Sequence, residues 1–188
     1  MTSNYTIKPI TTNSPAGEIE QAAEILTLAF RKHFPGAWET IEDGREEVTE
    51  MLADDRILLA AVVPDGSVVG WIGGIPEYDG NVWELHPLAV HPDFQGQGIG
   101  RALVETFEAE VRSRGGITIT LGTDDEDGST SLSNTDLYED TYRKMAELVN
   151  YGDHPVTFYQ KLGYKLTGVM PDANGVGKPD LIMGKRVG

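Results

Sequence analysis

The stretch of sequence that decides the fold is Gln95-Gly96-Gln97-Gly98-Ile99-Gly100. It follows the apolar segment 82–90 and precedes a stretch with apolar residues at every fourth position, namely Leu103, Phe107 and Val111. Strand, glycine turn and amphipathic helix are therefore expected in this order. Glycine allows positive φ and a close approach to a ligand, and the first amides of a helix lack partners within it. The turn is predicted to bind a phosphate group, helped by the positive charge of Arg101, although a tight surface turn remains the alternative for this motif alone.

Composition and charge narrow the class of protein. The chain has 188 residues, 39% of them hydrophobic and 24% charged, which fits one globular domain over residues 1–188. Its net charge of −15 disfavours nucleic acid and anionic lipid as partners and attracts cations, unless the charge serves only solubility. The sequence shows no secretory signal and no apolar run of membrane-spanning length, so a cytoplasmic protein is expected. Because cysteine is absent, no disulfide, thiolate nucleophile or cysteine-based metal site is expected, and no metal is predicted.

The remaining patterns predict a single α+β domain. Apolar runs and alternations predict strands over residues 5–10, 57–63, 68–75, 82–90, 117–121, 164–170 and 181–187. Helical spacing and glycine or proline boundaries predict helices over residues 19–30, around 48–52, from 98 or 100 to 115, around 137–148 and over 155–162.

The strand ahead of the glycine turn carries the candidate catalytic groups. Alternation places Val82, Glu84, His86, Leu88 and Val90 on one face of this strand. A carboxylate and an imidazole two residues apart on one face lie about 6–7 Å from each other. A cationic substrate with an amine resembling lysine would arrive as an ammonium ion and would have to lose a proton before its nitrogen could act as a nucleophile. Glu84 is the first candidate to bind this ammonium and accept its proton, and His86 is the alternative base, unless it is structural.

Proline within the strand predicts a local irregularity. Pro87 has no N–H to donate to a neighbouring strand, so the strand is expected to be bulged or splayed there. Such a distortion frees backbone groups near residues 88–90 for a ligand.

The glycine turn and a second motif resemble those of the GNAT acetyltransferases. The first has the pattern Gln-x-x-Gly-x-Gly between a strand and a helix, and the second is Phe158-Tyr159-x-Lys161-Leu162-Gly163-Tyr164. The resemblance implies a GNAT fold, in which helices flank a mixed central β-sheet with splayed strands, and implies acetyl-CoA as cosubstrate. Its pyrophosphate is then expected on Gln95, Gly96, Gln97, Gly98, Ile99, Gly100 and Arg101. Its pantetheine arm is expected on the backbone of Leu88, Ala89 and Val90. The resemblance also gives the Leu88 amide the part of oxyanion donor, and Tyr159 that of the acid that protonates the leaving thiolate.

Longer strings resemble the chromosomal-type aminoglycoside 6'-N-acetyltransferases. They are Trp83-Glu84-Leu85-His86-Pro87-Leu88, Ser113-Arg114-Gly115-Gly116-Ile117-Thr118-Ile119, Leu121-Gly122-Thr123-Asp124-Asp125, and the segment around Thr135-Asp136-Leu137-Tyr138-Glu139. This resemblance implies a polycationic aminoglycoside as acceptor, resistance to these antibiotics, and a homodimer built partly by the C-terminal strands. The transfer is expected to be a direct attack of the 6'-amine in a ternary complex.

An acidic surround fits a polycationic acceptor. Asp127 is the preferred substrate ligand, followed by Asp124 and Asp125, and the acidic residues 136, 139 and 140 lie near them in sequence. A solvated acidic loop is the alternative interpretation. Aromatic candidates for a wall against the sugar rings are Phe34, Trp38 and Tyr78.

Two other functions also fit the sequence. A GNAT enzyme with the same acidic cleft would also suit polyamines or the lysines of basic proteins. A non-catalytic domain that binds acetyl-CoA or the drug is the second alternative.

Overall fold

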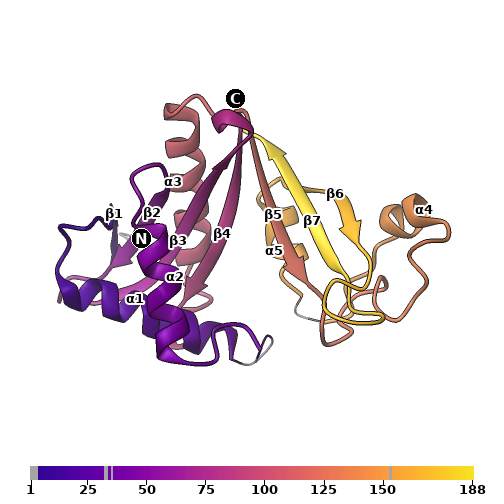
Figure 1. The fold of residues 1–188 in the computed structure, drawn as a ribbon, viewed down its shortest axis with the longest axis horizontal. Helices are drawn as coiled ribbons and strands as arrows, with labels where there is room; N and C mark the ends of the chain where they lie inside the picture. The colour runs from indigo at the N-terminus through magenta and orange to yellow at the C-terminus, as the bar shows by residue number, and fades with distance from the viewer. Residues whose placement is uncertain (1–3, 32–33, 35, 153) are drawn as a thin grey trace. The chain divides into compact units, whose positions relative to one another are not determined.

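The computed structural model describes residues 4–31, 34, 36–152 and 154–188 (Figure 1). Contacts divide the chain into two compact units. The first comprises residues 1–119 with 187–188, and the second comprises residues 120–186. The single domain expected over the whole chain stays a prediction.

The first unit is built on four antiparallel strands in the order β1-β2-β3-β4. These are β1 (Thr6–Pro9), β2 (Ile57–Val62), β3 (Val68–Glu77) and β4 (Val82–Val90). A hairpin joins β2 to β3, and the short 3-10 helix η1 (Tyr78–Gly80) joins β3 to β4. Every residue of β2 is buried, as its unbroken apolar run predicts for a strand covered on both faces.

Helices cover the two faces of this sheet (Figure 1). They are α1 (Ala16–Phe30), α2 (Ile41–Met51) and α3 (Ile99–Ser113). A Cβ placed on Gly73 would meet Met51 of α2, and one placed on Gly74 would meet Phe107 of α3. Successive residues of a strand point to opposite faces, so α2 and α3 lie on opposite faces. The indole of Trp71 in β3 donates a 2.8 Å hydrogen bond to the carbonyl of Ala22, which ties α1 to the face that α2 covers.

The second unit contains strands in the order β5-β7-β6 and two short helices. Strand β5 (Thr118–Asp124) begins in the first unit, and β6 (Lys165–Met170) pairs antiparallel with β7 (Asp180–Arg186). The helices are α4 (Thr141–Ala146) and α5 (Val156–Lys161). The buried side chains of this unit include Leu121, Leu132, Val156, Tyr164, Leu181 and Met183.

The α+β class is confirmed, and most elements lie where the sequence patterns predict them. The helix predicted around residues 137–148 is wrong at both ends, because α4 covers only Thr141–Ala146. Asp140 precedes α4 with a left-handed φ of 52°, so the helix cannot extend backward through it. In the described part of the chain, no helix is long and apolar enough to cross a membrane.

Candidate active site

A bulge interrupts β4 at the predicted proline. Ile72 of β3 pairs with Leu88, whereas Gly74 pairs with Leu85, so Gly73 alone faces both residues of the cis peptide His86–Pro87. Two residues of β4 against one of β3 is the geometry of a β-bulge. The irregularity predicted from Pro87 is confirmed.

The bulge also changes which side chains share a face, and this corrects the simple alternation. Glu84 pairs with Ile75, and Ala89 pairs with Trp71. Ile75 and Trp71 lie on the same face of β3, because they are four positions apart and side chains alternate between the two faces. Glu84 and Ala89 therefore share the face covered by α1 and α2, and Leu88 lies on the opposite face from Glu84. The expectation that Leu88 and Glu84 point the same way is wrong, because the extra residue of the bulge reverses the alternation.

An aromatic group lies beside the bulge. The indole of Trp38 lies 5.7 Å from the imidazole of His86, measured between ring centroids. Phe30 of α1 packs edge-on against Trp38 at 4.8 Å and contacts Phe34 at 5.7 Å. Two of the aromatic residues proposed for a sugar-facing wall thus belong to one cluster, and Trp38 reaches the strand that carries the candidate catalytic groups.

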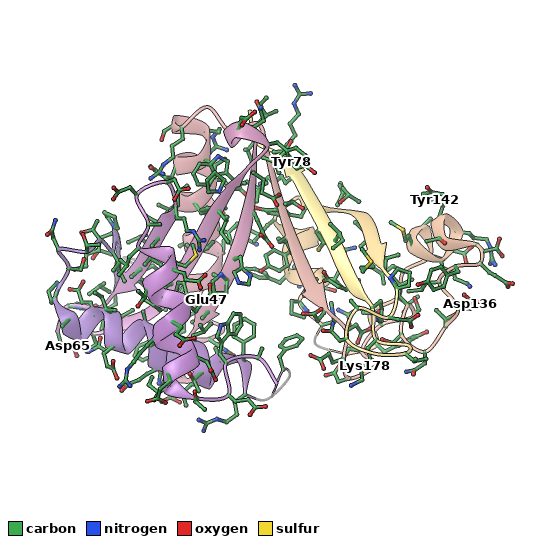
Figure 2. The ribbon with its side chains drawn as sticks, in the orientation of Figure 1. Glu47, Asp65, Tyr78, Asp136, Tyr142 and Lys178 are labelled. Atoms are coloured by element: carbon green, nitrogen blue, oxygen red, sulfur yellow. The ribbon has the colours of Figure 1, made fainter. Side chains whose placement is uncertain are left out.

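Tyr78 lies elsewhere in the same unit. It is 76% exposed and begins η1, at the turn between β3 and β4. Figure 2 shows Tyr78 at the far end of the strands from Glu47. The structure therefore separates Tyr78 from the aromatic cluster around Trp38.

Sequence reasoning missed Glu47, whose carboxylate forms an ion pair with His86. The Oε1 atom of Glu47 lies 3.5 Å from Nε2 of His86, and its Oε2 atom accepts a 3.2 Å hydrogen bond from the indole N–H of Trp38. Helix α2 begins at a capping box in which Thr40 and Asp43 exchange hydrogen bonds, and this fixes the helix that carries Glu47. The buried residues Gly44, Val48 and Met51 mark the inner face of α2, and Glu47 lies beside this stripe.

Glu47 raises the pKa of His86, and His86 lowers the pKa of Glu47. Burial of the imidazole lowers the pKa of His86, but the hydrogen bond and charge of Glu47 and the charge of Glu84 outweigh it, so the pKa is raised. Burial raises the pKa of Glu47, but its contact with His86 and the Trp38 hydrogen bond outweigh this effect, so the pKa is lowered. Both shifts favour the charged forms of the pair.

The glycine turn has the conformation that a phosphate site requires. Gly96 and Gly98 have positive φ values of 72° and 85°, and nothing lies within 4 Å of a Cβ placed on either. Gly98 is the N-cap of α3, so the predicted start of this helix is confirmed. Among the described residues, no side chain caps this end, and the first turn holds no acidic residue. The first amides of α3 are thus available to an anion.

Side chains brace this turn from within. The side-chain amide of Gln95 donates a 3.1 Å hydrogen bond to the carbonyl of Val90, and the side-chain amide of Gln97 donates a 3.2 Å hydrogen bond to the carbonyl of Asp93. Ile99 is buried and anchors the start of α3. Arg101 forms an exposed ion pair with Glu105 at 3.5 Å, which leaves its guanidinium at the surface of the first helical turn.

The acidic residues of the second unit have different surroundings. Asp125 is fully buried, and its carboxylate accepts hydrogen bonds from the amides of Ser129 and Thr130, both at 2.8 Å. It therefore shapes the loop and does not face solvent. Asp127 is exposed and accepts from the Ser129 hydroxyl, and Asp124 accepts from the side-chain amide of Asn174.

The other acidic candidates lie at the surface of this unit. Asp136, Glu139 and Asp140 are exposed. The hydrogen bond from Arg143 to Asp140, 2.7 Å long, lowers the pKa of that carboxyl. Asp136 accepts from the amide of Tyr138 at 2.9 Å.

Tyr159 lies on α5 in the interior of the second unit. Its side chain is 8% exposed and packs edge-on against Phe158 and Tyr164, with ring centroids 5.0 and 5.7 Å away. Burial raises its pKa far above the ordinary value for tyrosine, so the phenol keeps its proton at neutral pH. A phenol can donate a proton, but the raised pKa makes this one a weaker acid than an exposed tyrosine, so the part of acid stays a prediction for Tyr159.

Within the described residues, no group of three or more histidines or acidic side chains could hold a metal ion. The sequence profile of the acetyltransferase (GNAT) family matches residues 19–133, more than half of the chain. The chain belongs to the GNAT family of acetyltransferases. The matched region contains the bulged strand, the glycine turn and Glu47 of this GNAT protein.

Known proteins similar to this GNAT protein agree with that assignment. A crystal structure of an aminoglycoside 6'-N-acetyltransferase complexed with coenzyme A is 46% identical, with a TM-score of 0.88 and 97% of each chain covered. The aminoglycoside 6'-N-acetyltransferase from Enterococcus faecium is 45% identical, with a TM-score of 0.87 and the same coverage. The GNAT fold expected from the sequence is confirmed.

A more distant relative is an acetyltransferase of Sodalis glossinidius. It is 34% identical over 98 residues, which are 52% of this chain and 66% of that protein. An acetyltransferase of Pectobacterium atrosepticum is 34% identical over 91 residues, which are 48% of this chain and 61% of that protein. The chain thus spans less than two thirds of these two relatives.

Proposed function

We propose that this GNAT protein transfers the acetyl group of acetyl-CoA to the 6'-amine of aminoglycosides. The single observation that carries the proposal is the match to two aminoglycoside 6'-N-acetyltransferase structures over 97% of the chain at 45–46% identity. One of these structures was determined with coenzyme A. Site geometry adds independent support from residues of this chain.

The glycine turn fits the cosubstrate. Its open positive-φ glycines, the uncapped start of α3 and Arg101 together suit a pyrophosphate. Acetyl-CoA supplies an activated thioester to the reaction. The amides of Gln95 to Arg101 bind its phosphates, and the backbone of Leu88, Ala89 and Val90 beside the bulge binds its pantetheine arm.

Residues of β4 bind and activate the acceptor. Glu84 and His86 lie on the face covered by α1 and α2, where the negative charge of Glu84 and Glu47 attracts an ammonium group. One of the two strand residues takes the proton from the ammonium, and the neutral amine attacks the thioester carbonyl. The Leu88 amide stabilises the developing oxyanion, and the Tyr159 phenol gives its proton to the departing thiolate. Asp124 and Asp127 bind further amines of the drug, and Phe34 and Trp38 contact its sugar rings.

The wider biology follows from this reaction. Acetylation of the 6'-amine removes a positive charge from the antibiotic, so resistance is the expected consequence. The enzyme is expected in the cytoplasm, where its acetyl donor is made, with neither nucleic acid nor membrane as a partner. A homodimer is expected through the C-terminal strands, since β6 is an edge strand whose free side can pair with another chain.

Replacement of Glu84 tests the proposed site. Glu84→Gln keeps the shape of the side chain and removes its charge. We expect kcat/KM for the aminoglycoside to fall by about 10²-fold, with little change in the Kd for acetyl-CoA. Glu77→Gln makes the same change at the end of β3 and is expected to leave both values near wild type. Equal turnover for Glu84→Gln and wild type removes Glu84 from the mechanism.

A further inference from the structure

Glu47 differs from the other acidic residues of α2. Its side chain is 16% exposed, whereas those of Glu42 and Glu50 are 68% and 69% exposed. A carboxylate withdrawn from water requires partners, and both of its oxygens have one. These partners are the indole of Trp38 and the imidazole of His86.

The first contact fixes the carboxylate. The Trp38 indole N–H can only donate, and it donates to Oε2 of Glu47. This hydrogen bond leaves Oε1 directed at His86, whose ring also contacts the indole of Trp38. Trp38 therefore positions both members of the pair.

The second contact fixes the tautomer of His86. An ionised carboxylate only accepts hydrogen bonds, so the Nε2 atom that faces Glu47 carries a proton. In the neutral imidazole the lone pair then lies on Nδ1. When Nδ1 takes up a proton, the positive charge that results lies beside Glu47. A histidine base whose second nitrogen is held by a carboxylate is the general arrangement that activates such bases.

The other charged groups around His86 act in the same direction overall. Glu84 on the same strand also favours the protonated ring, and Arg56, in the loop between α2 and β2, opposes it. Two carboxylates against one guanidinium give the imidazole a net negative surround.

We infer that Glu47 is a positioning residue of the active site, which holds the Nε2–H tautomer of His86 and stabilises the imidazolium form. This deepens the proposed acetyl transfer and rests on it, because His86 is a candidate for the group that takes the proton of the acceptor. Helix α2 thus does more than pack against the sheet, because it places Glu47 beside His86.

The direct test is an NMR titration of the histidine side chains. The chain has 4 histidines, so the His86 signals can be assigned from a His86→Asn variant. We expect Glu47→Gln to move the titration midpoint of His86 to lower pH, because burial of the ring is then no longer outweighed. Glu46→Gln, the same change at the exposed neighbouring residue, is expected to leave that midpoint in place. An unchanged or higher midpoint in Glu47→Gln overturns the inference.

Kinetics separate a positioning role from a structural one. If neutral His86 takes the proton, the acidic limb of the pH profile of kcat/KM moves to lower pH in Glu47→Gln, and the plateau falls about tenfold. Glu47→Asp keeps the charge and is expected to restore much of the plateau. Where the limb belongs to His86, as its loss in His86→Asn would show, a lowered plateau with an unmoved limb in Glu47→Gln assigns Glu47 a structural role only and overturns the inference.

The two proposals fail in different ways. If no aminoglycoside is acetylated by the wild type, the proposed acceptor is wrong, whereas the NMR titration still decides whether Glu47 controls the charge of His86. Should Glu47→Gln not fold, Trp38→Phe provides the second variant, because it removes the hydrogen bond to Glu47 and keeps an aromatic ring. It is expected to lower the His86 midpoint as well, and an unchanged midpoint would contradict the inference.

Discussion

Gly73 and His86 lie in such close contact that a Cβ atom added to Gly73 would overlap the carbonyl oxygen of His86. The same Cβ would lie 2.6 Å from Cε of Met51 in α2. The bulge of β4 thus packs against β3 at Gly73, which has no side chain, and close to α2, the helix that carries Glu47. Glycine at this position allows the candidate catalytic strand to take its bulged form.

Replacement of this glycine should destabilise the fold. Gly73→Ala is expected to lower the free energy of unfolding by about 1–3 kcal/mol, because the backbone of β4 must move to admit the methyl group. Urea unfolding followed by circular dichroism measures this change. Gly17→Ala in α1 is the control, since nothing lies within 4 Å of its Cβ and alanine favours a helix. A Gly73→Ala protein as stable as wild type would show that the contact relaxes without loss.

The glycine turn should be needed for the cosubstrate more than for stability. Gly98→Ala forces alanine to a φ of 85°, which costs about 1–2 kcal/mol, and it displaces the amides expected to bind phosphate. We expect the Kd for coenzyme A to rise at least tenfold in isothermal titration calorimetry. Gly66→Ala is the matched control, because Gly66 also has a positive φ and open surroundings but lies in the β2–β3 turn. Equal weakening in both variants would speak against a phosphate site at Gly98.

Removal of the hydroxyl of Tyr159 tests whether this residue is the acid. Tyr159→Phe is expected to lower kcat by about 10²-fold, with the fold preserved, since the two side chains differ by one hydroxyl. Thiol release from acetyl-CoA measures the rate, and Tyr142→Phe, at a residue 87% exposed, is the control. A Tyr159→Phe enzyme with wild-type kcat and an unaltered pH profile would exclude the phenol as the acid.

The stability of the second unit should fall in acid because of His154. This buried ring accepts from the amide of Val156 at Nδ1, and its Nε2 lies 2.9 Å from the carbonyl of Asp124, so both contacts are made by the neutral form. Burial lowers its pKa below 6.5, and the hydrogen bond to Asp124 and the nearby aspartates offset this only in part. The folded pKa is depressed, so the stabilisation is present above pH 6.5 and is lost as the pH falls through the folded-state pKa.

A comparison of unfolding free energies between pH 7 and 5 checks this prediction. His154→Gln should show a shallower loss of stability toward low pH than wild type. His86 contributes with the opposite sign, because its folded pKa is raised, but it is present in both proteins and cancels. His91→Gln, at a residue whose side chain is 30% exposed, is the control. Parallel curves for wild type and His154→Gln would refute the assignment.

Much of the first unit could be predicted because its signals are periodic and local. The unbroken apolar run of β2, the alternation of β4 and the spacing in α3 each match the observed element. Gly98 as the start of α3 and the irregularity at Pro87 follow from backbone stereochemistry, which does not depend on distant residues. Of these features, the glycine turn is one of the two motifs on which the GNAT resemblance rests.

Other features depend on tertiary contacts that no local pattern records. Glu47 lies in the acidic stretch 45–50 and resembles a solvated face, although it is four residues before the buried Met51. That spacing is the signal in the sequence that Glu47 borders the inner face of α2. The loop around Asp125 is held by hydrogen bonds between its side chain and the backbone. The helix predicted at 137–148 is shorter, and in its first part backbone carbonyls accept from the side chains of Thr141 and Lys144.

Acetyl transfer to a 6'-amine is tested most directly by a comparison of acceptors. Thiol release from acetyl-CoA would be measured with two aminoglycosides that differ only in an amine or a hydroxyl at the 6' position, such as neomycin and paromomycin, and with spermidine and a basic peptide. We expect rapid turnover with the 6'-amine compound, a product acetylated at that nitrogen by mass spectrometry and NMR, and turnover at least 10²-fold slower with the others. Equal kcat/KM for the 6'-hydroxyl compound, for spermidine or for the peptide would contradict the claim.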